Sequence, residues 1–562
     1  MAGIISARQV LTPSGWLADH AIHLDELGTI VEISPRGFDP ATAVGTALPG
    51  LANVHTHSFQ RAMAGLAEAR GPQGVDDFWT WRKVMYRFLD ILTPDHIESI
   101  AALVQMEMAQ AGYSASAEFH YVHHQVGGEK FDDIAELSNA IFAASQTSGI
   151  GLTHLPVLYT YGGLDRRALN GGQLRFGNSA DQFEALYARI ADNSRGLPED
   201  FRLGIAPHSL RAVDRDGIEA CLTLCREGPI HIHAAEQIRE VEEVEGHLGA
   251  RPVRWLIDNM PVDERWCLIH ATHLDANEVE ALAASGAVAG LCPTTEANLG
   301  DGIFAARDYF AAGGRYGIGS DSNIRLSVAE ELRMLEVSQR LKHRQRAVLT
   351  DDATRSNGRY LYERAARGGA QAIGRKAGTI EIGMRADIVG LRDDLPFLDW
   401  PQPDQRLDAW IFGVEAHAVS DLWSAGRHIV QGGEHIRAAD IRARFARTIR
   451  ELAAALQQNQ RGEQLLKHLD QQLSELEQLP LNGQKIAFLL SMDTAKLRLA
   501  GTGSSGVALI DLLAGDSVAE FKNYQTVSAE SLMAMQPDII LVAGKNTSTA
   551  VDDLLTAKPI LL

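Results

Sequence analysis

The chain has 562 residues, of which 45% are hydrophobic and 22% charged, a composition that is typical of globular proteins and excludes a disordered chain. The formal net charge of −20 argues against nucleic acid or an anionic membrane surface as a partner. No apolar run approaches the ~20 residues of a membrane span, and the N-terminus lacks a basic segment followed by an apolar core. We therefore expect no secretory signal and a cytoplasmic location.

Two short β-rich segments lie far apart in the chain. Alternating apolar and polar residues over 21–24 and 30–33 predict strands within residues 1–48, and a similar pattern returns within 378–440. Each segment is therefore expected to form a small β unit.

Between these segments, residues 49–377 alternate helical patterns with short apolar strands. Repeated βα alternation over this length favours a parallel sheet closed into a (β/α)8 barrel, so the fold class is α/β. The elements that carry this prediction are helices over 96–112 and 236–259 and strands near 203–207, 267–271, 287–292 and 316–320.

The composition changes after about residue 450. Residues 454–479 are rich in Gln, Leu and Glu and predict one long helix, so we assign residues 441–479 to a helical extension or linker. Residues 480–562 then predict a second, partial α/β unit, with strands over 485–491 and 538–543 and helices near 504–514 and 528–536.

Metal-ligand residues stand at the ends of several predicted strands. His55 and His57 follow a short apolar run, and residues i and i+2 of a strand point to the same face. Further along, His233, His270 and Asp321 each end another predicted strand. Since a barrel gathers its working residues at the C-terminal ends of its strands, this order predicts one metal site.

The motifs PGLANVHTH, HIHAAE, LIHATH and GSDS resemble those of the amidohydrolase superfamily. The resemblance implies a (β/α)8 barrel flanked by a β-sandwich from both ends of residues 1–440. It implies that the metal ligands are His55, His57, His233 and Asp321. Residues 116–121 lack the lysine that bridges two metals in other members, so we expect one metal, and histidine nitrogens with one carboxylate suit Zn²⁺.

The same resemblance assigns catalytic roles to three residues. Asp321 is expected to accept a proton from the attacking water. Glu236, three residues after His233, is expected to carry protons to the departing nitrogen, and His270 to stabilise the developing alkoxide. This set favours hydrolysis of a C=N bond with release of ammonia.

Four further stretches, HSFQRAMAG, FWTWR, EFHYVHH and APHSLR, resemble the iminohydrolases that act on N-formimino-L-glutamate in histidine degradation. This resemblance covers residues 1 to about 452. It implies a small dicarboxylate substrate, N-formyl-L-glutamate and ammonia as products, and a homodimer. Guanidinium groups pair with carboxylates through forked hydrogen bonds. The expected substrate contacts are Gln60, Arg82, Tyr121, His208 and Arg211.

Two alternatives stay open. A related deaminase that acts on a purine-type ring would share the metal site, although it should prefer an aromatic pocket to paired arginines. The residues after 452 resemble part of a haem-uptake periplasmic binding protein, which suggests haem binding or transport. Because the match covers only part of one lobe, we expect a fused, passive segment without such a function.

Overall fold

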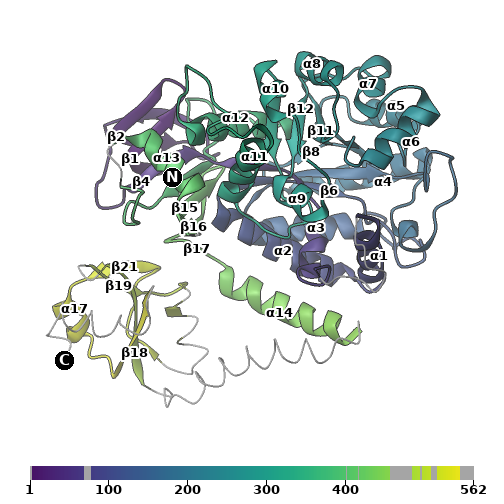
Figure 1. Cartoon of the computed structure of the whole chain (residues 1–562). Coiled ribbons are helices and arrows are strands. Elements are labelled where there is room, and N and C mark those ends of the chain that lie inside the picture. The colour runs from purple at the N-terminus through teal and green to yellow at the C-terminus, as the bar shows by residue number, and fades with distance from the viewer. Residues whose placement is uncertain are drawn as a thin grey trace. The chain divides into compact units, whose positions relative to one another are not determined.

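The structure is a computed structural model that describes residues 3–68, 78–399, 402–414, 417–455, 484–493, 496–504, 506–507, 510 and 516–544. The chain divides into two compact units, Met1–His435 and Ile436–Leu562, shown in Figure 1. The first unit holds a barrel and a flanking sheet, and the second holds a smaller sheet.

The barrel is a parallel sheet that closes on itself. Its strands run in the order β10-β11-β12-β13-β5-β6-β7-β8, and β9 also pairs with β7. Bridges from Ile205 to Ile230 and from Ser209 to His233 join the β8–β9 segment to β10 and complete the ring. The expected (β/α)8 barrel is confirmed, with β8 and β9 as one interrupted strand. Its strands are β5 (Leu51–Thr56), β6 (Tyr113–His120), β7 (Gly151–Leu158), β8 (Arg202–Leu203), β9 (Ala206–Pro207), β10 (Ile230–Ala234), β11 (Trp266–His270), β12 (Val288–Leu291) and β13 (Arg315–Ile318).

Helices connect these strands, and local signals set their ends. Helix α2 begins with a Thr93 capping box and Pro94, and it ends at Gly112, whose φ of 103° suits glycine. The other helices of this unit are α1 (Phe78–Leu89), α3 (Glu136–Ser148), α4 (Ala180–Asn193), α5 (Arg215–Leu224), α6 (Ile238–Leu248), α7 (Pro252–Asn259), α8 (Ala276–Ser285), α9 (Pro293–Leu299), α10 (Ala306–Ala311), α11 (Val328–His343), α12 (Asn357–Ala372) and α13 (Pro403–Phe412), with 3-10 turns η1 (Ser58–Met63), η2 (Gly171–Arg175) and η3 (Ser194–Gly196); α2 spans Pro94–Ala111.

One predicted helix was wrong in its extent. The segment 236–259 forms two helices, α6 and α7, instead of one. Gly249 ends α6 in the left-handed region with a φ of 75°, and Pro252 starts α7 because its fixed φ and missing N–H suit the first helical position.

Both ends of the first unit build the flanking sheet. Its eight strands follow one hydrogen-bonded path, β17-β16-β15-β14-β4-β1-β2-β3, in which β1 and β4 are parallel and the other pairs antiparallel. Buried aliphatic residues from both chain ends, including Ile22 and Ile388, form its core. The strands are β1 (Ile4–Thr12), β2 (Gly15–Leu24), β3 (Ile30–Ser34), β4 (Val44–Pro49), β14 (Ile388–Leu391), β15 (Val419–Ser424), β16 (Arg427–Gln431) and β17 (Glu434–His435).

A buried ion cluster ties the flanking sheet to the barrel. Arg375 Nη2 lies 2.9 Å from Asp200 Oδ2 and 2.8 Å from Asp387 Oδ1, and Arg427 donates to both oxygens of Asp200. Each buried charge has a partner, as burial away from water requires.

The second unit contains α14 (Ala438–Ala455), α17 (Ala529–Ala534) and a five-stranded sheet of β18 (Lys485–Asp493), β19 (Lys496–Ala500), β20 (Asp516–Ser517), β21 (Tyr524–Val527) and β22 (Ile539–Gly544). The predicted strands 485–491 and 538–543 are confirmed and pair in parallel, and the predicted helix 528–536 matches α17. Most of the expected long helix 454–479 and of the helix near 504–514 lies outside the described residues.

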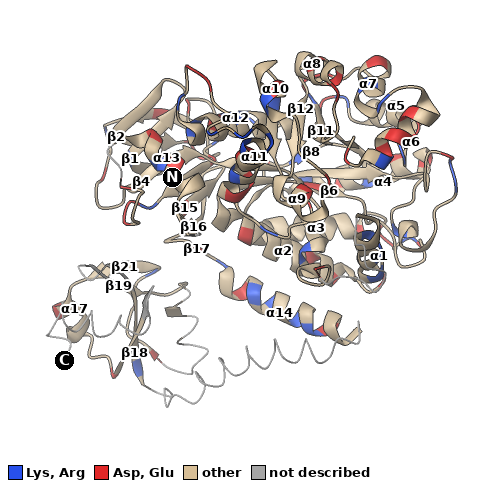
Figure 2. Ribbon diagram, in the orientation of Figure 1, with Lys and Arg blue, Asp and Glu red and all other residues tan. Residues whose placement is uncertain are grey.

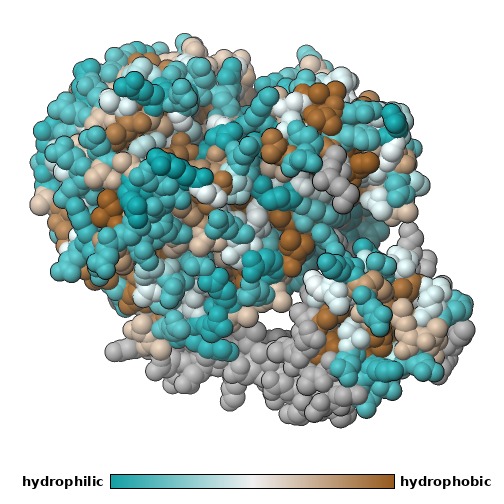
Figure 3. Space-filling model, turned by 180° about the vertical axis from the view of Figure 1, so that it is seen from behind, coloured by the Kyte–Doolittle hydropathy of each residue, from teal (hydrophilic) through white to brown (hydrophobic). Residues whose placement is uncertain are grey.

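Charged residues of both signs are spread over the helices of the first unit, and α14 also carries basic residues (Figure 2). The basic residues of α14 are all arginines. Hydrophilic side chains dominate the face shown in Figure 3, with small separate hydrophobic patches. Within the described residues, no helix combines the length and the apolar character needed to cross a membrane.

Candidate active site

The metal-ligand residues meet at the C-terminal ends of the barrel strands. His55 lies near the end of β5 and His57 follows it, His233 lies near the end of β10, His270 ends β11, and Asp321 follows β13. The prediction that these separate strand ends form one cluster is confirmed by their distances. This end of a β/α barrel is where active sites form.

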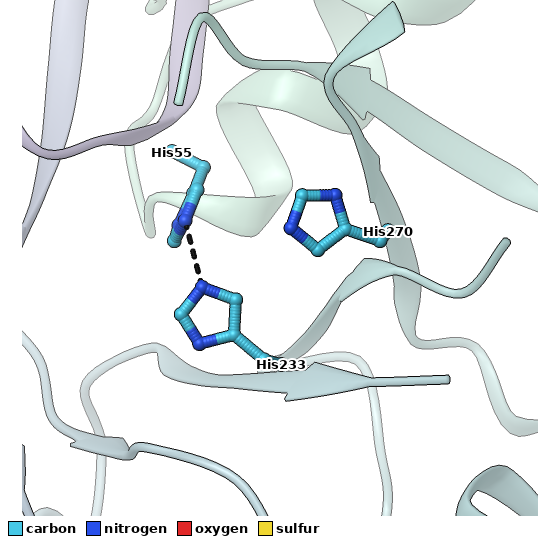
Figure 4. A group of neighbouring side chains, drawn as sticks. All are labelled: His55, His233 and His270. Carbon is cyan, nitrogen blue, oxygen red and sulfur yellow. Dashed lines mark hydrogen bonds between the residues drawn. The ribbon is translucent and has the colours of Figure 1, made fainter. Parts of the chain in front are cut away.

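Asp321 lies at the centre of the cluster. Its Oδ1 is 3.4 Å from His55 Nε2 and 3.3 Å from His57 Nε2, and its Oδ2 is 3.9 Å from His270 Nε2. The Nε2 atoms of His55 and His233 lie 3.1 Å apart. In Figure 4 the rings of His55, His233 and His270 face a common space.

The hydrogen bonds of two histidines show that this space suits a cation. The Nδ1 of His57 lies 3.0 Å from the Phe119 carbonyl oxygen, and the Nδ1 of His233 lies 3.1 Å from the His208 carbonyl oxygen. A carbonyl only accepts, so each Nδ1 carries the proton and each Nε2 presents a lone pair. These lone pairs converge with the Asp321 carboxylate, which is the donor set of a metal site.

The backbone is strained where these side chains are presented. Ala235, His270 and Asp321 have φ values of 54°, 67° and 44°, a region that residues other than glycine rarely adopt. The Asp321 N–H donates to the His55 carbonyl at 2.9 Å, and the His57 N–H donates to the Asp321 carbonyl at 3.0 Å. These bonds stabilise the turn and fix Asp321 beside the two β5 histidines.

Glu236 and His270 form an acid–base pair beside the cluster. Glu236 Oε1 is 3.8 Å from His270 Nε2, and its Oε2 is 3.8 Å from Arg211 Nη2. On the far side of the ring, His270 Nδ1 lies 3.3 Å from Glu296 Oε1. A carboxylate behind the imidazole favours its protonated form and fixes its orientation.

Burial and neighbouring charges separate the pKa values of these groups. Burial lowers the pKa of His55 to about 3, so His55 is neutral and able to bind a cation.

Burial opposes the charge of His270, yet Glu236, Glu296 and Asp321 together raise its pKa to about 10. Burial raises the pKa of Glu236, with His270 and Arg211 acting in the opposite direction. Burial disfavours the Asp321 carboxylate as well, but His55, His57 and His270 lower its pKa.

The cluster opens into a pocket with about 550 Å³ of empty space, part of it open to solvent. All of the predicted site residues except the fully buried His55 line it. The lining residues are His57, Gln60, Phe78, Trp81, Arg82, Met85, Tyr121, Tyr159, Phe176, His208, Arg211, His233, Glu236, His270, Leu299 and Asp321.

The predicted substrate contacts are held by their neighbours. Gln60 Nε2 donates to the Tyr121 hydroxyl at 2.9 Å, and Arg82 Nη2 donates to the Tyr159 hydroxyl at 3.1 Å. Among the described residues, the acidic partners of Arg211 are distant, with Glu240 at 4.0 Å and Glu236 at 3.8 Å. Within this part of the chain, both guanidinium groups therefore retain donors for an anion in the pocket.

Sequence reasoning did not identify three polar residues of the site. Tyr159 follows β7 at the same barrel end as the ligands, and this position was the available signal. Glu296 reaches His270 from α9, and Glu118 on β6 accepts hydrogen bonds from the Ser58 N–H and hydroxyl beneath the η1 turn. For the last two, nothing local in the sequence indicated the contact.

Two family models match the chain. The amidohydrolase family model covers residues 46–428, and the periplasmic binding protein model covers residues 428–561. The first spans the barrel and, within the flanking sheet, β14, β15 and most of β4, and the second spans the second unit.

Curated relatives and solved structures agree with the first match. Formimidoylglutamate deiminase of Pseudomonas aeruginosa is 47% identical over 434 residues, which is 77% of this chain and 95% of that enzyme. The 5-methylthioadenosine/S-adenosylhomocysteine deaminase of Halobacterium salinarum is 29% identical over 70% of this chain and 85% of that enzyme. An amidohydrolase from Brucella melitensis, known from a crystal structure, has 42% sequence identity to this chain. The two structures superpose with a TM-score of 0.76 over 80% of this chain and 99% of that one. An adenosine deaminase from Xanthomonas campestris with bound zinc is 22% identical with a TM-score of 0.67, covering 80% of this chain and 98% of that one, and it supports the fold alone. The chain therefore belongs to the amidohydrolase family of hydrolases and is a homologue of formimidoylglutamate deiminase.

Proposed function

We propose that the protein hydrolyses the C=N bond of N-formimino-L-glutamate to give N-formyl-L-glutamate and ammonia. The observation that carries the proposal is that two guanidinium groups, Arg82 and Arg211, line the same pocket as the histidine–aspartate cluster. The pocket thus offers a charge partner for each carboxylate of this substrate beside a hydrolytic centre. The 47% identity to a formimidoylglutamate deiminase supports the same reaction.

One Zn²⁺ is proposed as the cofactor, with His55, His57, His233 and Asp321 as its ligands. Convergent imidazole nitrogens and one carboxylate suit zinc, and a structural neighbour carries zinc. A zinc ion held there would lower the pKa of a coordinated water and supply a nucleophile near neutral pH.

The surrounding residues provide the proton transfers. Asp321 takes a proton from the attacking water as the oxygen adds to the formimino carbon. His270, kept protonated by Glu236 and Glu296, stabilises the charge that develops on that oxygen. Glu236, buried and close to His270, delivers a proton to the nitrogen, which leaves as ammonia. One water is consumed, and the C=N bond is replaced by C=O.

Substrate binding is proposed to neutralise the two arginines. The chain as a whole is acidic, with a formal charge of −20, so a dianion needs local positive charge in the pocket. Arg82 and Arg211 supply it, and Gln60, Tyr121 and His208 line the space around them with further polar groups.

A purine-ring deaminase is the second candidate. A curated relative named 5-methylthioadenosine/S-adenosylhomocysteine deaminase and the aromatic lining residues Phe78, Trp81 and Phe176 favour it. The deciding test measures ammonia release by the zinc-loaded protein from N-formimino-L-glutamate and, in separate assays, from guanine and from adenosine. Turnover of a purine without turnover of formiminoglutamate would reverse the assignment.

Three expectations from the sequence stay predictions: a homodimer, a cytoplasmic location and a passive second unit. The periplasmic binding protein match keeps haem binding as the alternative role of that unit. A Soret band on addition of haem to the purified chain would favour the alternative.

A further inference from the structure

Tyr159 lies beside Arg82, one of the two predicted carboxylate-binding groups. It follows β7, lines the pocket and is 3% exposed. Its ring packs edge-on against His208, with ring centroids 4.6 Å apart. The Tyr159 hydroxyl is 3.1 Å from Arg82 Nη2 and 3.1 Å from Gln173 Nε2.

The hydrogen bonds around this hydroxyl decide where its own proton points. A guanidinium can only donate, so the bond from Arg82 uses one lone pair of the hydroxyl oxygen. Gln173 Oε1 accepts from the backbone N–H of Asn170 at 3.4 Å, and a backbone N–H can only donate. The other end of the amide, which faces Tyr159, is therefore the NH₂ group.

The Tyr159 oxygen thus accepts two hydrogen bonds, and its O–H must be donated elsewhere. Among the described residues, no hydrogen bond is found in which Tyr159 is the donor. A buried hydroxyl proton without an acceptor is costly. The space that remains next to the hydroxyl is the pocket that Tyr159 lines.

We infer that Tyr159 is a substrate-binding residue whose hydroxyl donates to the carboxylate bound by Arg82. This inference deepens the proposed function and rests on it. Arg82 and Tyr159 then present only donors to that end of the substrate, with Gln173 fixing the direction of the hydroxyl. Two carboxylate oxygens satisfy those donors, whereas the NH₂ group of a carboxamide would oppose them. The pair selects an acid over the matching amide.

The primary test is the Tyr159→Phe variant of the zinc-loaded full chain. Loss of a hydrogen bond to a charged group should raise KM for N-formimino-L-glutamate about 10- to 100-fold, with kcat little changed. The matched control is Tyr161→Phe, which removes a hydroxyl that donates to Asp214 Oδ2 at 3.1 Å and belongs to a residue that does not line the pocket. The control should leave KM unchanged.

Truncated substrates separate binding from a merely structural role. The formimino derivatives of 4-aminobutyrate and 2-aminobutyrate each lack one carboxylate of the substrate. The effect of Tyr159→Phe should persist on one derivative and vanish on the other. The variant should also discriminate less between formiminoglutamate and the amide that replaces the carboxylate so identified, which is formiminoglutamine for the side-chain carboxylate and formiminoisoglutamine for the α-carboxylate. An equal loss on both derivatives, or a loss confined to kcat, would overturn the inference.

A second variant tests the direction of the proton. Gln173→Glu places an acceptor where the NH₂ group now donates, so the Tyr159 proton should turn away from the substrate and KM should rise. Adding Tyr159→Phe to Gln173→Glu should then cost little more. Additive losses would show that the new carboxylate acts only by its charge and would contradict the assignment.

The failure of this inference is distinguishable from that of the proposed function. If the wild-type chain turns over formiminoglutamate and Tyr159→Phe leaves KM unchanged, the role of Tyr159 fails alone. If the wild type releases no ammonia from formiminoglutamate, the proposed function fails, and calorimetric binding of glutarate to wild type and variant still tests the contact. An unchanged glutarate affinity would reject it.

Discussion

The two units of this chain both contain neighbouring parallel strands, yet they differ in what stands at the strand ends. In the barrel, β10 ends in His233 and Ala234, and β11 ends in His270. In the second unit, β22 ends in Val542, Ala543 and Gly544 beside β18. Among the described residues, the groups with metal-ligand spacing all belong to the barrel.

This difference shows that the barrel buries ionisable side chains around its pocket, although their burial lowers the stability of the fold. Burying a histidine or carboxylate costs free energy unless a partner compensates for the lost water. The barrel buries Glu236, His270 and Asp321 around one pocket. The described core of the second unit consists of aliphatic and aromatic residues that pack β18 against its neighbours. The barrel therefore carries a chemical function, and nothing comparable is visible in the described second unit.

The largest effect that would test this contrast is expected at Glu236. Glu236→Gln removes the proton carrier but keeps the shape, so kcat should fall by about 10²- to 10⁴-fold, and the zinc content should be retained. Metal analysis together with steady-state kinetics measures both quantities. The exposed Glu242→Gln on the following helix is the control. A near-normal kcat for Glu236→Gln would rule out the proton carrier.

A smaller effect is expected at Arg211. Arg211→Met should raise KM for formiminoglutamate about 10- to 100-fold, because a charge-assisted bond to a carboxylate is lost. It should disturb the zinc content little. Arg215→Met, which removes an exposed arginine paired with Glu219, serves as the control. A normal KM in the Arg211 variant would remove the carboxylate role.

The ion cluster that joins the barrel to the flanking sheet predicts a pH effect on stability. Burial alone would raise the pKa of Asp200, but Arg427 and Arg375 lower it below the ordinary value of 3.8. The lowered pKa contributes stability that is present above the unfolded pKa and is lost as the pH falls below about 4 towards the folded pKa. The loss between about pH 6 and pH 3, measured by denaturant unfolding, should be about 1 kcal/mol. Asp200→Asn should flatten this dependence, and an unchanged slope would contradict the prediction.

The smallest effect is expected from the second unit. Deleting residues 455–562 should leave kcat, KM and zinc content unchanged, because every described residue proposed to act lies within the first unit. Activity assays on the truncated and full chains make the comparison. Loss of activity in a folded truncated protein would show that the two units are functionally coupled. It would contradict the prediction that the barrel acts without the second unit.

Local patterns in the sequence were enough to predict much of the site. The His55–His57 spacing placed two ligands on one strand face, since side chains alternate along a strand. His233, His270 and Asp321 each followed an apolar run, and the alternation of strands and helices predicted a barrel whose strand ends share one face. The single helix predicted over 236–259 was wrong because the turn at Gly249 and Pro252 interrupts an otherwise continuous helical pattern.

What the sequence determined by itself was therefore the type, order and strand position of the ligands, because these depend on neighbours a few residues apart. Only the tertiary structure decided which polar groups surround them. Glu296 on helix α9 reaches His270 at the end of strand β11, and Tyr159 meets Arg82 across 77 residues. Closure of the barrel brings Asp321 within 3.4 Å of His55. Contacts of that kind arise from packing between distant elements, and local periodicity carries no information about them.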